Sequence, residues 1–75
     1  MPFSYKKLWI KLIEENIRKS ELLDIASISG NIMAKMGKNE PVSLQSLEKI
    51  CLALNCDIGE IVEIVREGVP HEKID

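Results

Sequence analysis

Apolar residues recur at intervals of three and four along most of this chain, which is the spacing of one face of an α-helix. The first such segment begins after Ser4, a suitable N-cap, and ends near Asn16; its apolar stripe comprises Tyr5, Leu8, Trp9, Leu12 and Ile13. A second segment covers Lys19 to Ala26, with Arg18 at the position where a serine or threonine cap is expected. The pattern therefore predicts two short amphipathic helices.

A turn follows the second segment and leads into a third helix. Ser27-Ile28-Ser29-Gly30 interrupts the helical pattern, and we expect Ile28 to pack between the two flanking helices. Ser29 is a suitable N-cap for a helix that runs to about Lys38, since Gly37 costs about 1 kcal/mol relative to alanine inside a helix. The side chains expected to face inward are Met33 and Met36.

Two further helices are predicted in the second half of the chain. Ser43 caps the fourth, which Asn55 closes and whose apolar positions are Leu44, Leu47, Ile50, Cys51 and Leu54. Asp57 and Glu60 form a capping box that predicts a fifth helix, ended by Gly68-Val69-Pro70, with apolar residues Ile58, Ile61, Val62 and Val65. No strand-like alternation occurs. The expected fold is all-α, with five short helices in a single domain over residues 1–75, an ordered core at about 4–66 and a tail at 67–75.

The charges are distributed unevenly along the chain. The net charge is −2, whereas nucleic-acid-binding domains are usually basic. Through Lys38, seven basic side chains against four acidic ones give +3; from Asn39 onward, three basic against eight acidic give −5. An asymmetry of this kind allows one face to turn toward phosphate while the rest of the surface is acidic.

The cysteines and the histidine indicate neither a metal site nor a catalytic one. Cys51 and Cys56 lack the second Cys or His pair of a zinc site, and a reduced core thiol explains Cys51 better than a disulfide does. His71 stands alone in the tail, so no nucleophile–histidine pair can be assembled. No apolar run approaches the roughly 20 residues of a membrane span. We expect a cytoplasmic protein that is not an enzyme, with no cofactor, metal or evident small-molecule ligand.

Three segments of the chain resemble one known family. They read LLDIASIS at 22–29, MAKMGKNEPVSL at 33–44 and LEKICLALNCDI at 47–58. They resemble the Cro and lambda-repressor type of helix-turn-helix regulators, and the second and third are most similar to its small stand-alone bacterial branch. The resemblance extends from about Tyr5 to Val65 and implies a compact five-helix DNA-binding domain. It also implies that residues 19–26 form the positioning helix and residues 30–38 the recognition helix.

The chain departs from this family pattern at several positions. Family members usually carry glycine in the turn where this chain has Ser27, and often a small polar residue at the position of Gly30. The wider family often has a base-reading glutamine near Lys19, which this chain lacks. The resemblance therefore does not transfer the base specificity of its relatives.

The start of the recognition helix contains the candidate base-reading residues, which are Ser29, Gly30, Asn31, Ile32 and Lys35. The Asn31 amide can pair with adenine N6 and N7, or it can satisfy a free backbone group at the helix start. Gly30 either allows a close approach to DNA or only relieves the turn. Ile32 either touches a thymine methyl or fills the core. The candidate phosphate-binding residues are Arg18, Lys19, Ser20, Lys38 and Asn39. Lys35 could also neutralise a phosphate in place of reading a base, and any single lysine is as readily a solvated surface residue.

The sequence thus predicts a transcriptional regulator that binds double-stranded DNA with its recognition helix in the major groove. We expect a homodimer on a palindromic operator, because one domain of this size contacts few bases. The expected dimer contact is the fifth helix, through Ile58, Ile61, Val62, Ile64 and Val65; the alternative is that all five residues belong to the core. A second hypothesis is a protein-interaction module on the same fold without DNA binding, which the acidic net charge and the missing glutamine favour.

Overall fold

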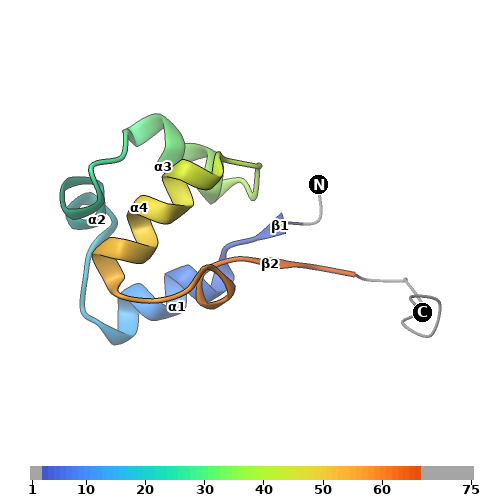
Figure 1. Ribbon diagram of the computed structural model, residues 1–75, viewed down its shortest axis with the longest axis horizontal. Coiled ribbons are helices and arrows are strands. Elements are labelled where there is room, and N and C mark those ends of the chain that lie inside the picture. The colour runs from blue at the N-terminus through green and yellow to red at the C-terminus, as the bar shows by residue number, and fades with distance from the viewer. Residues whose placement is uncertain (1–2, 67–75) are drawn as a thin grey trace.

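Four α-helices make up most of the computed structural model, which describes residues 3–66 (Figure 1). The helices are α1 (Lys6–Glu14), α2 (Lys19–Ala26), α3 (Gly30–Gly37) and α4 (Leu44–Leu54). A 3₁₀-helix, η1 (Ile58–Glu60), follows α4, and the strands β1 (Phe3–Ser4) and β2 (Glu63–Ile64) flank the helical part. The longest described helix, α4, has 11 residues, so no helix within residues 3–66 has the length or apolarity to cross a membrane.

The prediction of a fifth helix was wrong. The backbone N–H of Asp57 donates to Glu60 Oε2 at 3.0 Å, so this half of the predicted capping box is present. Helical hydrogen bonding nevertheless ends within one turn, at η1. After Ile61, which closes the turn, the chain becomes extended, a conformation that suits the β-branched residues Val62, Ile64 and Val65. The predicted helix end at residues 68–70 and the tail with His71 lie outside the described residues.

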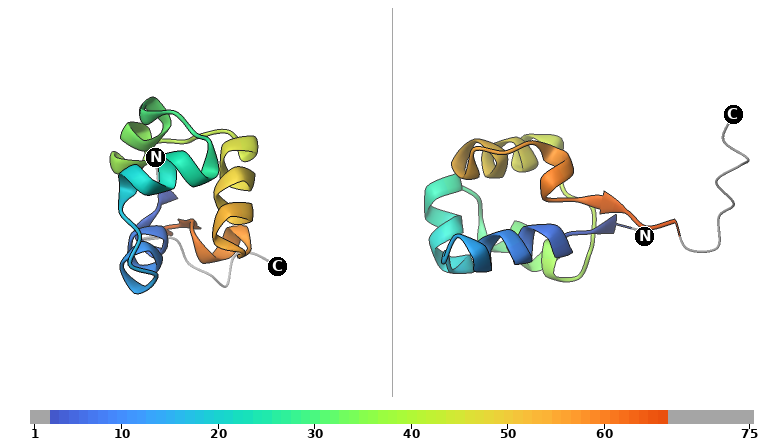
Figure 2. Two further views of the ribbon diagram at one scale, coloured as in Figure 1. Left: turned by 90° about the vertical axis from the view of Figure 1, so that its left-hand side faces the viewer. Right: turned by 90° about the horizontal axis from the view of Figure 1, so that it is seen from below.

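A two-stranded antiparallel ribbon replaces that helix. β2 pairs with β1, with Phe3 opposite Ile64 and Ser4 opposite Glu63. Figure 2 shows the ribbon extending from one end of the helical part. Ser4 therefore lies in a strand and is not the N-cap of α1, although its Oγ accepts the N–H of Lys6 at 3.3 Å. The described part of the chain is mostly helical and fits the predicted all-α helix-turn-helix fold, but it contains four α-helices where five were predicted.

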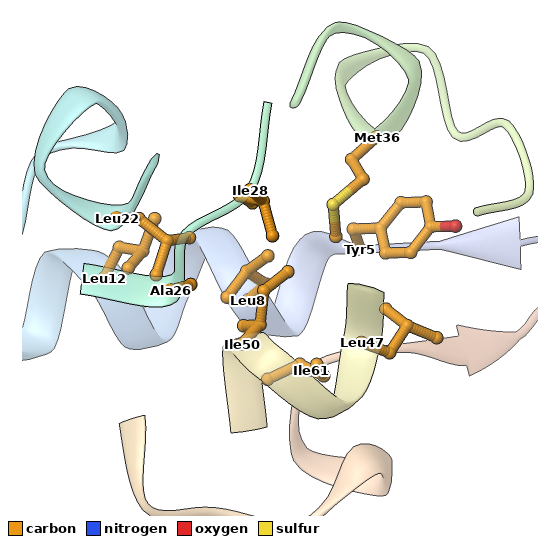
Figure 3. Close-up of a cluster of buried hydrophobic side chains, with 10 residues drawn as sticks. All are labelled: Tyr5, Leu8, Leu12, Leu22, Ala26, Ile28, Met36, Leu47, Ile50 and Ile61. Carbon is orange, nitrogen blue, oxygen red and sulfur yellow. The ribbon is translucent and has the colours of Figure 1, made fainter. Parts of the chain in front are cut away.

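The hydrophobic core lies where the four helices and the segment after η1 meet (Figure 3). Its buried side chains are Tyr5, Leu8, Leu12, Leu22, Ala26, Ile28, Met36, Leu47, Ile50 and Ile61. The predicted burial of Ile28 and Met36 is confirmed, and Met33 packs against this core. Ile13 and Leu44 were expected in apolar stripes but are 78% and 73% exposed, because each lies at the edge of its helical stripe.

Each α-helix is followed by a residue with left-handed backbone angles. The φ angles are 59° at Asn16, 55° at Ser27, 58° at Asn39 and 55° at Asn55. Asparagine tolerates this conformation better than most residues, so the predicted helix closures at Asn16 and Asn55 are confirmed. Ser27, in the turn between α2 and α3, is the one residue of the four that is not asparagine.

Candidate nucleic-acid interface

α2 and α3 form a helix-turn-helix whose turn is fixed by backbone bonds, by a serine cap and by one buried side chain. Beyond Ser27, the N–H of Ile28 donates to the C=O of Leu23 at 3.1 Å and closes α2. Ser29 is extended, and its Oγ accepts the N–H of Ile32 at 3.3 Å, which confirms it as the N-cap of α3. Because Ile28 is buried, the turn is also anchored to the core.

The amino end of α3 is open to solvent. Ser29, Gly30 and Asn31 are all exposed, and among residues 3–66 the side chain of Asn31 has no hydrogen-bond partner. A Cβ on Gly30 would meet nothing within 4 Å, and Gly30 does not occupy the left-handed region, so neither the turn nor packing requires glycine there. Ile32 is half-buried against the core, whereas Lys35 is exposed.

The amino end of α2 presents the exposed residues Arg18, Lys19 and Ser20. The N–H of Arg18 donates to Glu21 Oε1 at 2.8 Å, which is the half of a capping box that a glutamate at the third helical position supplies. The Arg18 side chain itself makes no cap bond, so the weak cap predicted there is confirmed. Lys19 Nζ lies 4.3 Å from the centroid of the Trp9 ring, a cation–π contact that links α2 to α1. Sequence spacing could not have indicated this contact, because the two residues belong to different helices.

The loop after α3 is fixed to the start of α1. The N–H of Tyr5 donates to Asn39 Oδ1 at 3.3 Å, and the Tyr5 hydroxyl donates to the C=O of Glu40 at 2.7 Å. Burial raises the pKa of the Tyr5 hydroxyl, because the phenolate would lose its hydration. The bond to Tyr5 uses the side-chain oxygen of Asn39, so the Nδ2 amino group is the part of this side chain that could donate to a phosphate. Lys38, beside it, is exposed.

Lysines on α1 bind the segment that carries η1 and β2. Lys7 Nζ lies 3.5 Å from Glu63 Oε1 and donates to the C=O of Gly59 at 3.2 Å. Lys11 Nζ lies 3.6 Å from Glu60 Oε1. These contacts turn the two ammonium groups toward η1 and β2, so they are poor candidates for binding phosphate.

The expected dimer residues differ in their exposure to solvent. Ile61 is completely buried, so its expected role at a dimer surface was wrong and it belongs to the core. Val62 is half-buried and packs against that core. The other three, Ile58, Ile64 and Val65, are exposed. Ile58 and Ile64 also line an apolar groove of about 320 Å³ that Phe3 and Leu44 border.

The chain belongs to the Cro/C1-type helix-turn-helix DNA-binding family. The sequence profile of that domain matches residues 7–67, a range that contains α2, α3 and α4 completely. The fold of this family is that of DNA-binding transcription regulators and is generally not enzymatic.

Among solved structures, the chain is similar to the crystal structure of the transcriptional regulator VanUg. The two share 47% sequence identity with a TM-score of 0.83, and the alignment covers 88% of each chain. No curated protein matches the chain significantly.

Proposed function

We propose that this protein is a sequence-specific transcriptional regulator that places the amino end of α3 in the major groove of double-stranded DNA. The observation that carries the proposal is the exposed Asn31 side chain. Because Ser29 already caps α3, the Asn31 amide is not required as a cap. It can donate to N7 of an adenine and accept from its N6 amino group, a pairing worth about 1–3 kcal/mol of discrimination against the wrong base.

Exposed polar residues elsewhere on the helix-turn-helix supply candidate contacts to the DNA backbone. Lys35 and Lys38 lie on and just after α3, and Arg18 and Ser20 lie at the amino end of α2. Contacts of this kind position a domain on the duplex and provide affinity without reading sequence. Lys19 joins them only if its ammonium group leaves the Trp9 ring, which costs about 0.5–1 kcal/mol at an exposed site.

The regulator acts as a homodimer on a palindromic operator. Two copies related by a twofold axis present their α3 ends to half-sites about 34–36 Å apart. The exposed apolar residues Ile58, Ile64 and Val65, together with the adjoining groove, support a dimer contact at η1 and β2. No residue that lines this groove belongs to α2 or α3, so the proposed dimer contact does not use the helices that would bind DNA.

Selection of bound duplexes from a random pool, followed by mobility-shift titration, tests DNA recognition. Asn31→Ala should relax specificity at one base pair of each half-site, because a base contact is lost. Lys35→Ala should weaken binding to all duplexes alike and lower the salt slope by about 0.9 per phosphate contact. Lys6→Ala is the matched control: it removes the same charge from an exposed lysine on α1, outside the helix-turn-helix, and it should leave the salt slope unchanged.

Two outcomes would contradict these assignments. If the folded chain bound no duplex at any salt concentration, the interaction-module hypothesis on the same fold would replace the proposal. If Asn31→Ala weakened binding to every sequence equally, its role would be to contact phosphate or to maintain the fold, and the base-reading assignment would be withdrawn.

Sedimentation equilibrium tests the dimer surface separately. Ile64→Glu should dissociate the dimer, because it places two carboxylates in an apolar contact. Ile13→Glu is the control: Ile13 is also an exposed isoleucine, on α1, and its replacement should leave the mass unchanged. A wild-type chain that stayed monomeric even with its selected operator would refute the homodimer.

A further inference from the structure

The turn between α4 and η1 brings two cysteines together. Asn55 is left-handed, with φ 55° and ψ 55°, and the N–H of Cys56 donates to the C=O of Cys51 at 3.0 Å. This bond between the first and sixth residues of the turn is the Schellman closure of a helix. The side chains of those two residues commonly touch, and in this chain both of them are thiols. Local backbone geometry therefore places the cysteines side by side.

The surroundings of the two thiols differ. Both cysteines are free and half-buried, and they line the same open depression together with Glu48 and Asp57. Burial raises the pKa of the Cys51 thiol to about 11, with further increases from Cys56, Asp57 and Glu60. Burial also raises the pKa of Cys56, as do the carboxylates of Glu60 and Asp57 to a smaller extent. There the ammonium group of Lys11 on α1 and a hydrogen bond with Cys51 act in the opposite direction. Cys56 is therefore the thiol that deprotonates more readily.

We propose that Cys51 and Cys56 form a reversible oxidation site, at which a low-molecular-weight disulfide converts the two thiols into an intramolecular disulfide. The Cys56 thiolate attacks one sulfur of the small disulfide, forms a mixed disulfide and releases one small thiolate. Cys51 then loses its proton and attacks Cys56 Sγ, which releases the second small thiolate. Two electrons pass from the protein thiols to the small disulfide, and the two protons end on the released thiols.

Folding favours the second step over the competing formation of a second mixed disulfide. The left-handed Asn55 and the 3.0 Å backbone bond hold the two ends of the turn together before any sulfur bond forms. The folded chain therefore offers Cys51 to Cys56 at a higher effective concentration than a flexible chain does. The same raised pKa values keep the thiols protonated near pH 7, so the site reacts with a disulfide slowly and is not a strong general nucleophile.

An equilibrium with reduced and oxidised glutathione tests the proposal on the full chain. Mass spectrometry would measure the fraction that has lost two hydrogen atoms, in native buffer and in urea that unfolds the chain. The native equilibrium constant should exceed the unfolded one by at least about tenfold. By linkage, the oxidised chain should also unfold at higher urea concentration. A native constant no larger than the unfolded one, or a native product that carries two glutathiones, would overturn the proposal.

Single variants test the order of attack. Cys51→Ser should accumulate a mixed disulfide at Cys56, because the resolving thiol is absent. Cys56→Ser should react more slowly, because burial raises the pKa of the remaining Cys51 thiol, which lacks the Lys11 ammonium group that favours the Cys56 thiolate. For both variants the rate should rise by close to tenfold per pH unit from pH 7 to 8, while the thiols are mostly protonated. A Cys56→Ser rate equal to or above that of Cys51→Ser would overturn the assigned order.

Discussion

Replacement of Ser27 by glycine should stabilise this protein. Ser27 ends α2 in the left-handed conformation, with φ 55° and ψ 46°, and it is exposed. The bonds that close the helix here are made by backbone atoms, including the 3.1 Å bond from Ile28 N–H to Leu23 C=O. Glycine can make all of these bonds without a Cβ close to the neighbouring carbonyl.

The expected gain follows from two opposing terms. The left-handed conformation costs a residue with a Cβ roughly 1–2 kcal/mol, which glycine avoids. Glycine loses more conformational entropy on folding, which offsets roughly 0.5–1 kcal/mol of this stabilisation. The net increase in the free energy of unfolding is therefore about 0.5–1 kcal/mol. For a domain of this size, that increase corresponds to a rise in Tm of roughly 2–8 °C.

Urea and thermal unfolding followed by circular dichroism would measure the change. Ser20→Gly is the matched control, because Ser20 is an exposed serine within the same helix. That substitution should lower the free energy of unfolding by roughly 0.5 kcal/mol, because glycine has a lower helix propensity than serine. If Ser27→Gly also lowered stability, the idea that left-handed strain is relieved at Ser27 would be refuted.

Two further predictions concern the contacts that join α1 to the loop after α3. Tyr5→Phe should cost about 1–2 kcal/mol of unfolding free energy in urea at pH 7, because the C=O of Glu40 loses its 2.7 Å donor. Because the pKa of the Tyr5 hydroxyl is raised in the folded state, this group ionises at lower pH in the unfolded chain than in the folded one. The free energy of unfolding of the wild type should therefore fall as the pH rises above about 10. Tyr5→Phe should lack the part of this decrease that comes from Tyr5. Asn39→Gly should lower the free energy of unfolding by about 0.5–1.5 kcal/mol more than Asn16→Gly does in the same assay. Both asparagines have left-handed backbone angles, but only Asn39 also accepts the N–H of Tyr5.

Each of these predictions has an outcome that contradicts it. Equal alkaline sensitivity of wild type and Tyr5→Phe would show that other groups control unfolding at high pH. Equal costs for the two asparagine variants would show that the bond to Tyr5 contributes nothing measurable.

Sequence reasoning located α1 to α4 and most of the core because the signals that define them are local. The predicted caps Ser29 and Ser43 accept backbone N–H groups from three residues ahead, at 3.3 Å and 3.1 Å. The left-handed Asn16 and Asn55 end α1 and α4. Caps, turn residues and apolar periodicity all act within about one helical turn, so the amino-acid order alone determines them.

Only the tertiary structure determined the strand pairing and the contacts between segments that are far apart in the sequence. The segment after Glu60 has both a capping box and β-branched residues, and the presence of a partner strand at Phe3 and Ser4 selects the extended form. Contacts between segments that are distant in sequence likewise place Lys19 on Trp9 and Asn39 on Tyr5. The amino-acid order thus determined the helices and the exposed start of α3. Packing determined the ribbon and these contacts, because their energies depend on partners that are close in space and not along the chain.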